Sequence, residues 1–262
     1  MGWEFWIDRG GTFTDLVGRA PGGGLIVRKV LSVQPGVPGD PAVAAIREVV
    51  GLEPQVPIPE GLIHELRLGT TVATNALLEQ AGDPVLLLTN CGLGDLLRIG
   101  DQHRLELFAL EVERGPWLAS AVVEVEGRLD AEGREITPLR CDSALEQSLL
   151  DARKQGLCSC AIALMHAYRN PAHELQLQQL ADALGFETVV CSHQVSPLPR
   201  LVPRGQTALV EAVVARVLFG YVDQVLDALG AGAQVQVMGV RASHALALGR
   251  GRCAGSGGAI GE

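Results

Sequence analysis

Residues 3–15 read WEFWIDRGGTFTD, and the expected architecture follows from how this stretch begins. Its first half alternates apolar side chains with others in a period of two, which is typical of a half-buried strand. Asp8 ends the alternation and leads into the glycine pair Gly10 and Gly11, after which apolar residues resume. The pattern predicts a strand, a tight turn and a second strand over residues 13–19.

The rest of the chain alternates helical patterns with short apolar strands. Such alternation is typical of an α/β sheet, and the antiparallel strands at the start make the sheet mixed rather than purely parallel. The proline-bearing stretch at residues 196–205 is the best linker candidate, so a domain boundary is expected there. The remaining expected elements are strands at 25–31, 66–68, 84–88, 122–129, 160–164, 187–191 and 235–238, and helices at 41–50, 72–80, 93–99, 142–154, 171–184 and 207–229.

The composition describes a folded, acidic protein. Hydrophobic residues make up 47% of the 262 residues and charged residues 19%, a mixture too apolar for a disordered chain. The 21 basic residues face 30 acidic ones, and the net charge of −9 argues against nucleic-acid binding. No run reaches the roughly 18 uninterrupted apolar residues of a membrane span, and the N-terminus lacks a secretion signal. We therefore expect a cytoplasmic protein without a membrane or nucleic-acid partner.

The first candidate site is the glycine turn between the two opening strands. Gly10 and Gly11 lack the Cβ atom that blocks close backbone approach, so their amide N–H groups can face the anionic oxygens of a polyphosphate. Thr12 and Thr14 add neutral hydroxyl donors if the turn orients them inward. Asp8 would repel a phosphate, so its role would be to bind Mg²⁺, usually through water, or to position the attacking oxygen. The spacing equally fits a plain hairpin that Asp8 caps.

A second cluster, LGTTVATN at residues 68–75, lies at an expected junction between a strand and a helix. Thr70 or Thr71 can cap the helix that follows Gly69, which leaves N–H groups that suit an anion. Asn75 is a polar residue in the first turns of an otherwise apolar helix, and a ligand contact would explain it. Simple helix capping is the alternative interpretation of this cluster.

Four segments carry a resemblance to a known family. They are DRGGTFTD at residues 8–15, LRLGTTVATNALLE at 66–79, GLGDLLRIGDQHRLELFAL at 92–110 and SPLPRLVPRGQTA at 196–208. In this order, over about residues 3–238, the chain resembles the N-terminal region of the hydantoinase A and 5-oxoprolinase family. Arg9, directly after the first aspartate, makes it more similar to the ATP-hydrolysing 5-oxoprolinases than to hydantoinase or acetone carboxylase chains.

The resemblance implies an actin-like, ribonuclease H-like ATPase fold that uses ATP and Mg²⁺. Residues 1–195 would form the hydantoinase/oxoprolinase N-terminal domain, and 196–262 a linker and the incomplete beginning of a second ATPase domain. The family reaction opens 5-oxo-L-proline to L-glutamate while ATP is hydrolysed to ADP and phosphate. Phosphorylation of the lactam oxygen turns a poor electrophile into an activated imidate that water can attack.

The resemblance also assigns candidate site residues by position. The phosphate loop of the family corresponds to Asp8, as the catalytic and Mg²⁺-binding residue, together with Gly10, Gly11, Thr12 and Thr14. The second signature corresponds to Gly69, Thr70, Thr71 and Asn75. A guanidinium in the substrate cleft would pair with the carboxylate of 5-oxoproline, and a surface salt bridge is the alternative role for each candidate. These substrate-binding candidates are Arg98, Asp101, Gln102, Arg104 and Arg204.

Two departures from the family pattern concern the C-terminal end. The strand at 235–238 is not followed by a Ser-Asp-Gly-Gly-type turn, and the glycine run at 254–259 lacks the proline of the corresponding family loop. We therefore expect an N-terminal piece of a longer 5-oxoprolinase that hydrolyses ATP poorly or not at all alone. Its partners would be a small cyclic-amide substrate, the missing C-terminal ATPase region, and a hydantoinase B-like region or subunit.

Three other interpretations stay open. The chain could instead be a hydantoinase A-type subunit of an ATP-dependent amidohydrolase. It could be a noncatalytic α/β module that binds a phosphorylated ligand, or that binds a partner chain through the helix at 207–229. A sugar-kinase-like phosphotransferase shares the aspartate and double-glycine opening, but the later segments of this chain do not resemble one.

Overall fold

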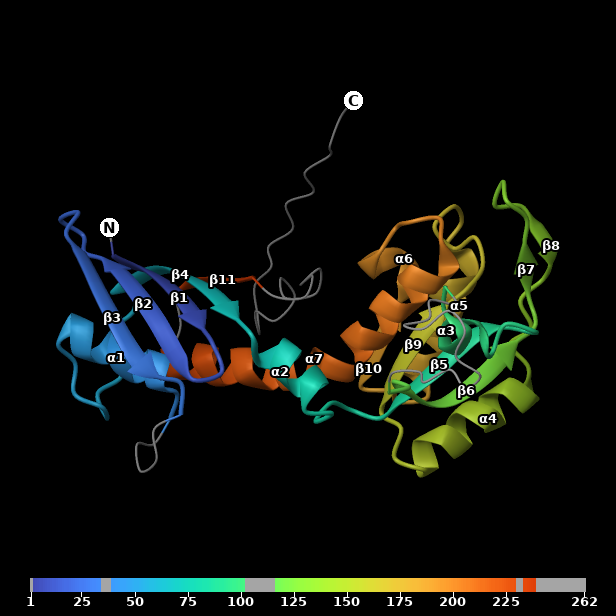
Figure 1. Ribbon diagram of the computed structural model, residues 1–262, viewed down its shortest axis with the longest axis horizontal. Coiled ribbons are helices and arrows are strands. Elements are labelled where there is room, and N and C mark those ends of the chain that lie inside the picture. The colour runs from blue at the N-terminus through green and yellow to red at the C-terminus, as the bar shows by residue number, and fades with distance from the viewer. Residues whose placement is uncertain (1, 34–38, 102–115, 230–232, 239–262) are drawn as a thin grey trace, which may run out of the picture. The chain divides into compact units, whose positions relative to one another are not determined.

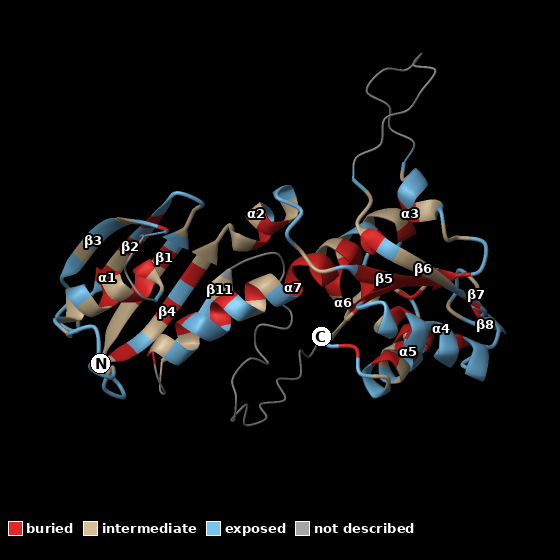
Figure 2. Cartoon of the chain, turned by 90° about the horizontal axis from the view of Figure 1, so that it is seen from below, coloured by how far each residue is buried: buried red, intermediate tan, exposed pale blue. Residues whose placement is uncertain are grey.

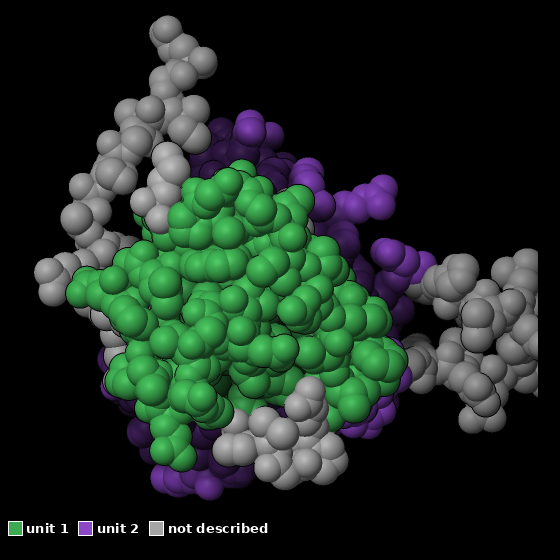
Figure 3. Space-filling view, turned by 90° about the vertical axis from the view of Figure 1, so that its left-hand side faces the viewer, with its two compact units in different colours: residues 1–75, 218–262 green, residues 76–217 purple. Residues whose placement is uncertain are grey.

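The computed structural model describes residues 2–33, 39–101, 116–229 and 233–238. The chain forms two compact units (Figure 3), of which unit 1 comprises residues 1–75 and 218–262, and unit 2 comprises residues 76–217. The boundary predicted at 195/196 does not coincide with this division. The units are divided within two helices, α2 and α7, rather than at the proline-bearing stretch.

Unit 1 is built on a five-stranded mixed sheet with strand order β11-β4-β1-β2-β3 (Figure 1). β2 pairs antiparallel with both β1 and β3, β4 pairs parallel with β1, and β11 pairs parallel with β4. The mixed α/β fold class that the sequence predicts is confirmed. The elements that contribute to this unit are β1 (Trp3–Arg9), β2 (Phe13–Arg19), β3 (Leu25–Leu31), α1 (Pro41–Val50), β4 (Ile63–Thr70), α2 (Val72–Leu78), the end of α7 (Leu201–Leu229) and β11 (Gln234–Met238).

One face of the unit 1 sheet packs against helices. Phe5 and Leu66 are fully buried on that face, in one hydrophobic cluster with Ile46 of α1 and Tyr221 of α7. Figure 2 shows the buried residues of α1 in red where the helix meets the sheet. α1 begins after Asp40, whose carboxylate accepts a hydrogen bond of 2.8 Å from a backbone N–H of the first turn. Asp40 is therefore the N-cap of α1, and the helix predicted at 41–50 is confirmed.

Unit 2 contains a parallel four-stranded sheet with strand order β10-β9-β5-β6. β5 is buried along its whole length, as its continuous apolar run predicts. Leu149 of α4 and Leu177 of α5 share a hydrophobic cluster with residues of this sheet. The elements of the unit are β5 (Val85–Asn90), α3 (Leu96–Ile99), β6 (Ala119–Val125), β7 (Arg128–Leu129), β8 (Glu135–Thr137), α4 (Ser143–Lys154), β9 (Ser159–Ala163), α5 (Ala172–Ala183), β10 (Thr188–Cys191), α6 (Ser192–Val195) and most of α7.

Helix α7 begins at Leu201, inside the stretch predicted to be a linker. Pro203 is tolerated there because it lies in the first helical turn, where a backbone N–H would have no partner within the helix. Gly205 permits close packing, since a Cβ at this position would lie 2.7 Å from the Leu97 side chain. Proline and glycine indicated a loop from composition alone, whereas in the structure they fit a helix start and a tight contact.

The strand predicted at 122–129 is divided in the structure. β6 ends at Val125 and β7 begins at Arg128, because Gly127 adopts a φ of 150° between them. Within the described ranges, no helix is both long and apolar enough to cross a membrane.

Candidate functional site

The turn between β1 and β2 lies at the carboxyl end of β1 in unit 1. Asp8 is opposite Asp15 of β2 on one side and Gly69 of β4 on the other. Its side chain is exposed, and the hydrogen bonds and ion pairs among the described residues do not include it. Gly69 leaves the space beside it open, because a Cβ there would lie 3.5 Å from Oδ1 of Asp8. The carboxylate is therefore available to a cation or a water molecule.

The backbone amides of the turn are only partly used by the fold. The N–H of Gly10 donates to the carbonyl of Phe13 at 3.0 Å. Among the described residues, no backbone acceptor takes the N–H of Gly11 or Thr12, and both residues are exposed. The turn is therefore a hairpin that keeps two amide donors open next to Asp8, an arrangement that suits an anionic oxygen.

The second predicted cluster lies directly beside this turn. The N–H and hydroxyl of Thr71 donate to the carbonyl of Arg9 at 2.9 and 3.3 Å, which ties the start of α2 to the end of β1. The hydroxyl oxygen of Thr70 accepts from the N–H of Val72 at 3.1 Å, so this threonine supports the first residue of α2. Asn75 approaches the loop, since a Cβ on Gly11 would lie 3.1 Å from its Nδ2. The contact with α2 explains Thr70, whereas Asn75 borders Gly11 while its Nδ2 donates to the hydroxyl of Thr71 at 3.5 Å.

Behind the turn is a buried group of hydroxyls that sequence reasoning placed only in part. Thr14 is 1% exposed, and its hydroxyl lies 2.9 Å from the hydroxyl of Ser32. Ser32 in turn donates to the carbonyl of Gly10 at 2.8 Å. The sequence analysis missed Ser32, because its contact with Gly10 depends on the pairing of β3 with β2. Thr14 supports the turn from inside and does not point outward with the open amides.

Arg9, on which the subfamily assignment depends, has a structural position. Strand alternation places its side chain on the face opposite that of Asp8, where Nη1 lies 2.6 Å from Oδ2 of Asp40. The guanidinium also stacks over the ring of Tyr221, 4.2 Å from its centroid. This residue therefore joins β1 to α1 and α7 on the helical face of the sheet.

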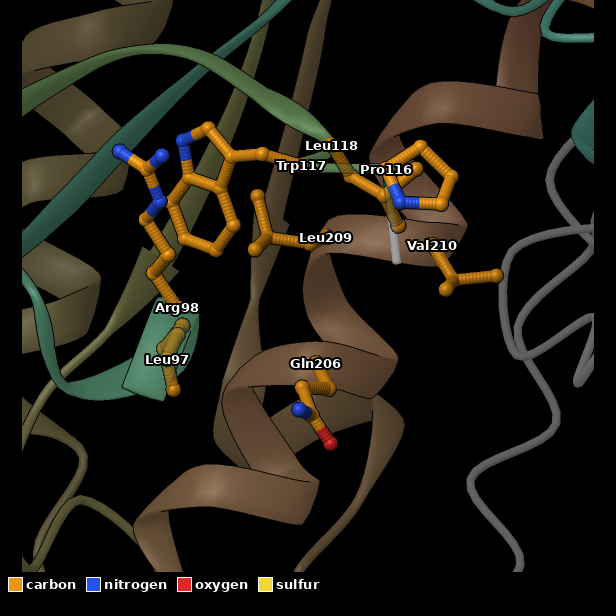
Figure 4. Close-up of a pocket in the computed structure, with 8 residues that line it drawn as sticks. All are labelled: Leu97, Arg98, Pro116, Trp117, Leu118, Gln206, Leu209 and Val210. Atoms are coloured by element: carbon orange, nitrogen blue, oxygen red, sulfur yellow. The ribbon is translucent and has the colours of Figure 1, made fainter. Parts of the chain in front are cut away.

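Arg98 belongs to unit 2, where it lines a cavity of about 370 Å³ (Figure 4). Its side chain extends alongside the indole of Trp117, and Gln206 contributes an amide from α7. A mostly apolar cavity with one exposed guanidinium can accept a small organic anion. Gln102 and Arg104, the neighbouring substrate-binding candidates, lie outside the described residues. The full lining is Leu97, Arg98, Pro116, Trp117, Leu118, Gln206, Leu209 and Val210.

Arg204 is a fully buried residue of unit 2. Its Nε donates to the hydroxyl of Ser192 at 2.8 Å and its Nη1 to the carbonyl of Leu198 at 2.9 Å, while Nη2 donates to the carbonyl of Leu164. Burial lowers the pKa of the guanidinium. All three nitrogens are engaged by the protein, so the interpretation of Arg204 as a substrate-binding residue does not fit its position.

Glu174 completes this buried network. One carboxylate oxygen accepts from the N–H of Leu164 at 2.9 Å and from Ser192 at 2.6 Å. The other accepts from the N–H and Nδ1 of His193 at 3.0 and 2.6 Å. Ligand atoms of Glu174, Cys191 and His193 lie within 4.8 Å of one another, which alone resembles a metal site. Because the carboxylate already accepts four hydrogen bonds beside a guanidinium, the group is a structural network.

Comparison with known proteins identifies relatives along most of the chain. Residues 4–185 match the family model described as the hydantoinase/oxoprolinase N-terminal region. The chain is 37% identical over 259 residues to 5-oxoprolinase 1 of Arabidopsis thaliana, and the match covers 87% of this chain and 20% of that protein. The chain thus spans about a fifth of the length of the curated 5-oxoprolinases that it matches.

Two solved structures are similar to this one. The nucleotide-free structure of acetone carboxylase matches with a TM-score of 0.70 at 20% identity, over 87% of this chain and 34% of that chain, and shows the fold alone. The crystal structure of the ATP-dependent caprolactamase from Pseudomonas jessenii matches with a TM-score of 0.66 at 28% identity, over 89% of this chain and 35% of that one.

Proposed function

The chain belongs to the hydantoinase/oxoprolinase N-terminal region family, and from this premise we propose that it is the N-terminal part of an ATP-dependent 5-oxoprolinase. The proposed reaction converts 5-oxo-L-proline, ATP and water into L-glutamate, ADP and phosphate. The similarity to 5-oxoprolinase 1 of Arabidopsis supports this substrate. The similarity to an ATP-dependent caprolactamase supports ATP-dependent chemistry on a cyclic amide. A hydantoin is the alternative substrate.

The observation that carries the proposal is the open hairpin turn of unit 1. Asp8 presents a carboxylate without a partner among the described residues, and the N–H groups of Gly11 and Thr12 are open beside it. A polyphosphate needs donors for its oxygens and a cation to neutralise its charge. The turn supplies amide donors and a cation-binding carboxylate at the carboxyl end of β1. Gly69 places no side chain in the same space.

The donor set at this turn fits Mg²⁺ as well as phosphate. An exposed aspartate is a typical Mg²⁺ ligand, directly or through water, and the ion would supply charge neutralisation of the triphosphate. In the proposal Asp8 holds the ion, Gly11 and Thr12 donate to phosphate oxygens, and Asn75 borders the same space from α2. Gly10, Thr14, Thr70 and Thr71 maintain the loop through contacts within the protein.

Two further elements of the proposal concern architecture and substrate. We propose that the mixed sheet of unit 1 is the first domain of an actin-like ATPase, and that the residues from 196 onward lead into a second ATPase domain. Arg98, which is exposed at the unit 2 cavity, is the remaining described candidate for pairing with the substrate carboxylate. Completion of the reaction would require the C-terminal ATPase region and a hydantoinase B-like region or subunit.

Isothermal titration of the 262-residue chain with Mg-ATP tests the nucleotide site. We expect weak binding that Asp8→Ala abolishes, because this substitution removes the carboxylate that would hold the ion. Glu4→Gln is the matched control, since Glu4 lies on the same strand and the same face but is paired with Arg19. Equal loss in both variants, or no binding by the parent chain, would contradict the assignment.

A product assay tests whether the chain catalyses the reaction without the C-terminal regions. We expect no ADP release that depends on 5-oxoproline from the chain alone, because it spans about a fifth of its 5-oxoprolinase relatives. Release of ADP and glutamate by the 262 residues would show that the C-terminal ATPase region and the hydantoinase B-like region are dispensable. Transfer of the ATP γ-phosphate to a sugar that replaces 5-oxoproline in the assay would instead favour a kinase.

A further inference from the structure

The hydroxyl of Ser32 occupies a position behind the candidate phosphate loop that the proposed function does not use. Ser32 follows β3 and is 2% exposed. It contacts the loop at two points: its Oγ donates to the carbonyl of Gly10 at 2.8 Å, and its N–H donates to the carbonyl of Thr12 at 2.9 Å. One residue directly after a third strand therefore holds both ends of the glycine turn.

The contact with Gly10 fixes the direction of the next amide. The carbonyl of Gly10 and the N–H of Gly11 belong to one planar trans peptide group and point in opposite directions. Because Ser32 holds the carbonyl on the buried side, the N–H of Gly11 must point toward the exposed side, where Gly11 itself lies. Glycine at both positions would otherwise let this peptide group rotate freely.

The pattern of hydrogen bonds also fixes the role of Thr14. A serine hydroxyl has a single proton, and Ser32 uses it on the carbonyl of Gly10. In the contact of 2.9 Å between the two hydroxyls, Thr14 must therefore be the donor. The chain of hydrogen bonds runs from Thr14 to Ser32 to Gly10, and both side chains are buried. Thr14 acts on the loop through Ser32.

We infer that Ser32 is a positioning residue that directs the Gly11 amide toward the phosphates of a bound nucleotide. This inference rests on the proposed function for its ligand, but the geometry of the loop stands on the contacts above. Without the hydroxyl, the peptide group between Gly10 and Gly11 would lose its only described anchor on the buried side and would sample several orientations. The N–H of Gly11 would then point toward the ligand for only part of the time.

The experiment compares Ser32→Ala with Ser32→Thr, which keeps the hydroxyl, and with Ser148→Ala as a matched control. Ser148 also donates to a backbone carbonyl, at 2.9 Å, but lies in α4 of unit 2. Titration with Mg-ATP should show about tenfold weaker binding for Ser32→Ala, the order of effect of one lost hydrogen bond, and near-parent binding for the other two variants. A merely structural role would lower stability without changing the affinity of the folded chain.

A second measurement separates this inference from the proposed function. The ¹⁵N heteronuclear NOE of the Gly11 amide, recorded without nucleotide, should fall in Ser32→Ala and remain at the parent value in Ser32→Thr. If the parent binds Mg-ATP and Ser32→Ala binds equally well, the positioning role is wrong and the nucleotide site stands. If the parent does not bind at all, the proposed function fails, and an unchanged NOE in Ser32→Ala would overturn the positioning role independently.

Discussion

The two units place charged side chains in opposite environments, one exposed and without partners and the other buried and hydrogen-bonded. In unit 1, Asp8 stands exposed at the end of β1 without a partner among the described residues, next to two backbone amides that are also open. In unit 2, Glu174 and Arg204 are both fully buried, and Ser192 donates to one and accepts from the other. Judged by residue type alone, the second group looks more like an active site than the first.

The difference lies in the hydrogen-bonding capacity that each group leaves unused. The carboxylate of Glu174 accepts four hydrogen bonds from the protein, and the guanidinium of Arg204 donates from all three nitrogens. The carboxylate has no acceptor capacity left, and full burial keeps the two remaining N–H groups of Arg204 away from a ligand. Such a network stabilises one arrangement of strands and helices. Asp8 has its full capacity available. Unused polar capacity at a strand end distinguishes a candidate site from a structural network here.

Glu174→Gln should give the largest loss of stability among the changes considered. The amide would turn an N–H₂ group toward donors of Leu164, Ser192 or His193, and it would remove the negative charge that Ser192 connects to Arg204. Each buried donor left without an acceptor costs about 1–3 kcal/mol. Native-state hydrogen exchange of the β5 amides measures the effect in unit 2.

Glu132→Gln is the control for that change. Glu132 is 64% exposed and pairs only with Arg134 on the surface, so its loss should cost no more than about 0.5 kcal/mol. If Glu174→Gln cost as little as Glu132→Gln, the unit 2 network would not be structural, and its contrast with the Asp8 loop would disappear.

Glu211 of α7 provides a second buried carboxylate, but one without compensation. It is 7% exposed, its Oε2 has no hydrogen-bond partner among the described residues, and burial raises its pKa to about 7. A raised folded-state pKa means that the folded chain prefers the protonated form, so its contribution to stability is complete below about pH 4.5 and is lost as pH rises through 7. The expected loss is up to about 3 kcal/mol.

Urea unfolding between pH 5 and pH 8 measures this dependence. Glu211→Gln removes the ionisation and should flatten the curve, while every other titrating group remains shared by the two proteins. If the curves of the parent and of Glu211→Gln ran parallel, Glu211 would be hydrated or paired in solution. Glu211 and Glu174 would then both have hydrogen-bond partners.

Much of this arrangement was predictable from local sequence patterns. The strands of the opening hairpin, the Asp40 cap and the buried β5 follow from alternation, capping chemistry and a continuous apolar run, all of which act within a few residues. The residues of the candidate loop also follow, because Asp8 and its glycines are adjacent in the chain. Asn75 was identified as a polar residue in an apolar helix, and it does border the loop.

The parts that could not be predicted depend on contacts between distant residues. Ser32 reaches Gly10 only because β3 returns beside β2, and an isolated serine after a strand gives no sign of this. Arg204 resembles a substrate ligand until the fold buries it against Leu164 and Ser192. Arg9 follows Asp8 directly in the sequence, but alternation along β1 turns its side chain to the opposite face. Side-chain direction and burial are tertiary properties.

Asp40→Ala tests the contact between Arg9, which directly precedes the candidate loop, and the start of α1. The substitution removes both the N-cap of α1 and the partner of Arg9, and we expect a loss of about 1–2 kcal/mol in the stability of unit 1. Asp142→Ala is the matched control, because Asp142 caps α4 through the N–H of Leu145 and lies 4.0 Å from its nearest cation. Equal losses in the two variants, measured by urea unfolding, would mean that the pair with Arg9 adds nothing.

Asp8→Asn should have the smallest effect on stability, although Asp8 is the central residue of the proposed site. Its carboxylate makes no hydrogen bond or ion pair within the described protein, and it lies opposite the like-charged Asp15 of β2. Neutralisation should therefore change the unfolding free energy by less than about 0.5 kcal/mol. Urea unfolding of the parent and the variant at pH 7 measures the change. A loss above about 1 kcal/mol would mean that Asp8 caps the hairpin, because only a carboxylate engaged by the turn can stabilise it. The same variant would then be expected to loosen the loop as well as weaken nucleotide binding, and the distinction between an open site and a closed network would no longer separate the two units.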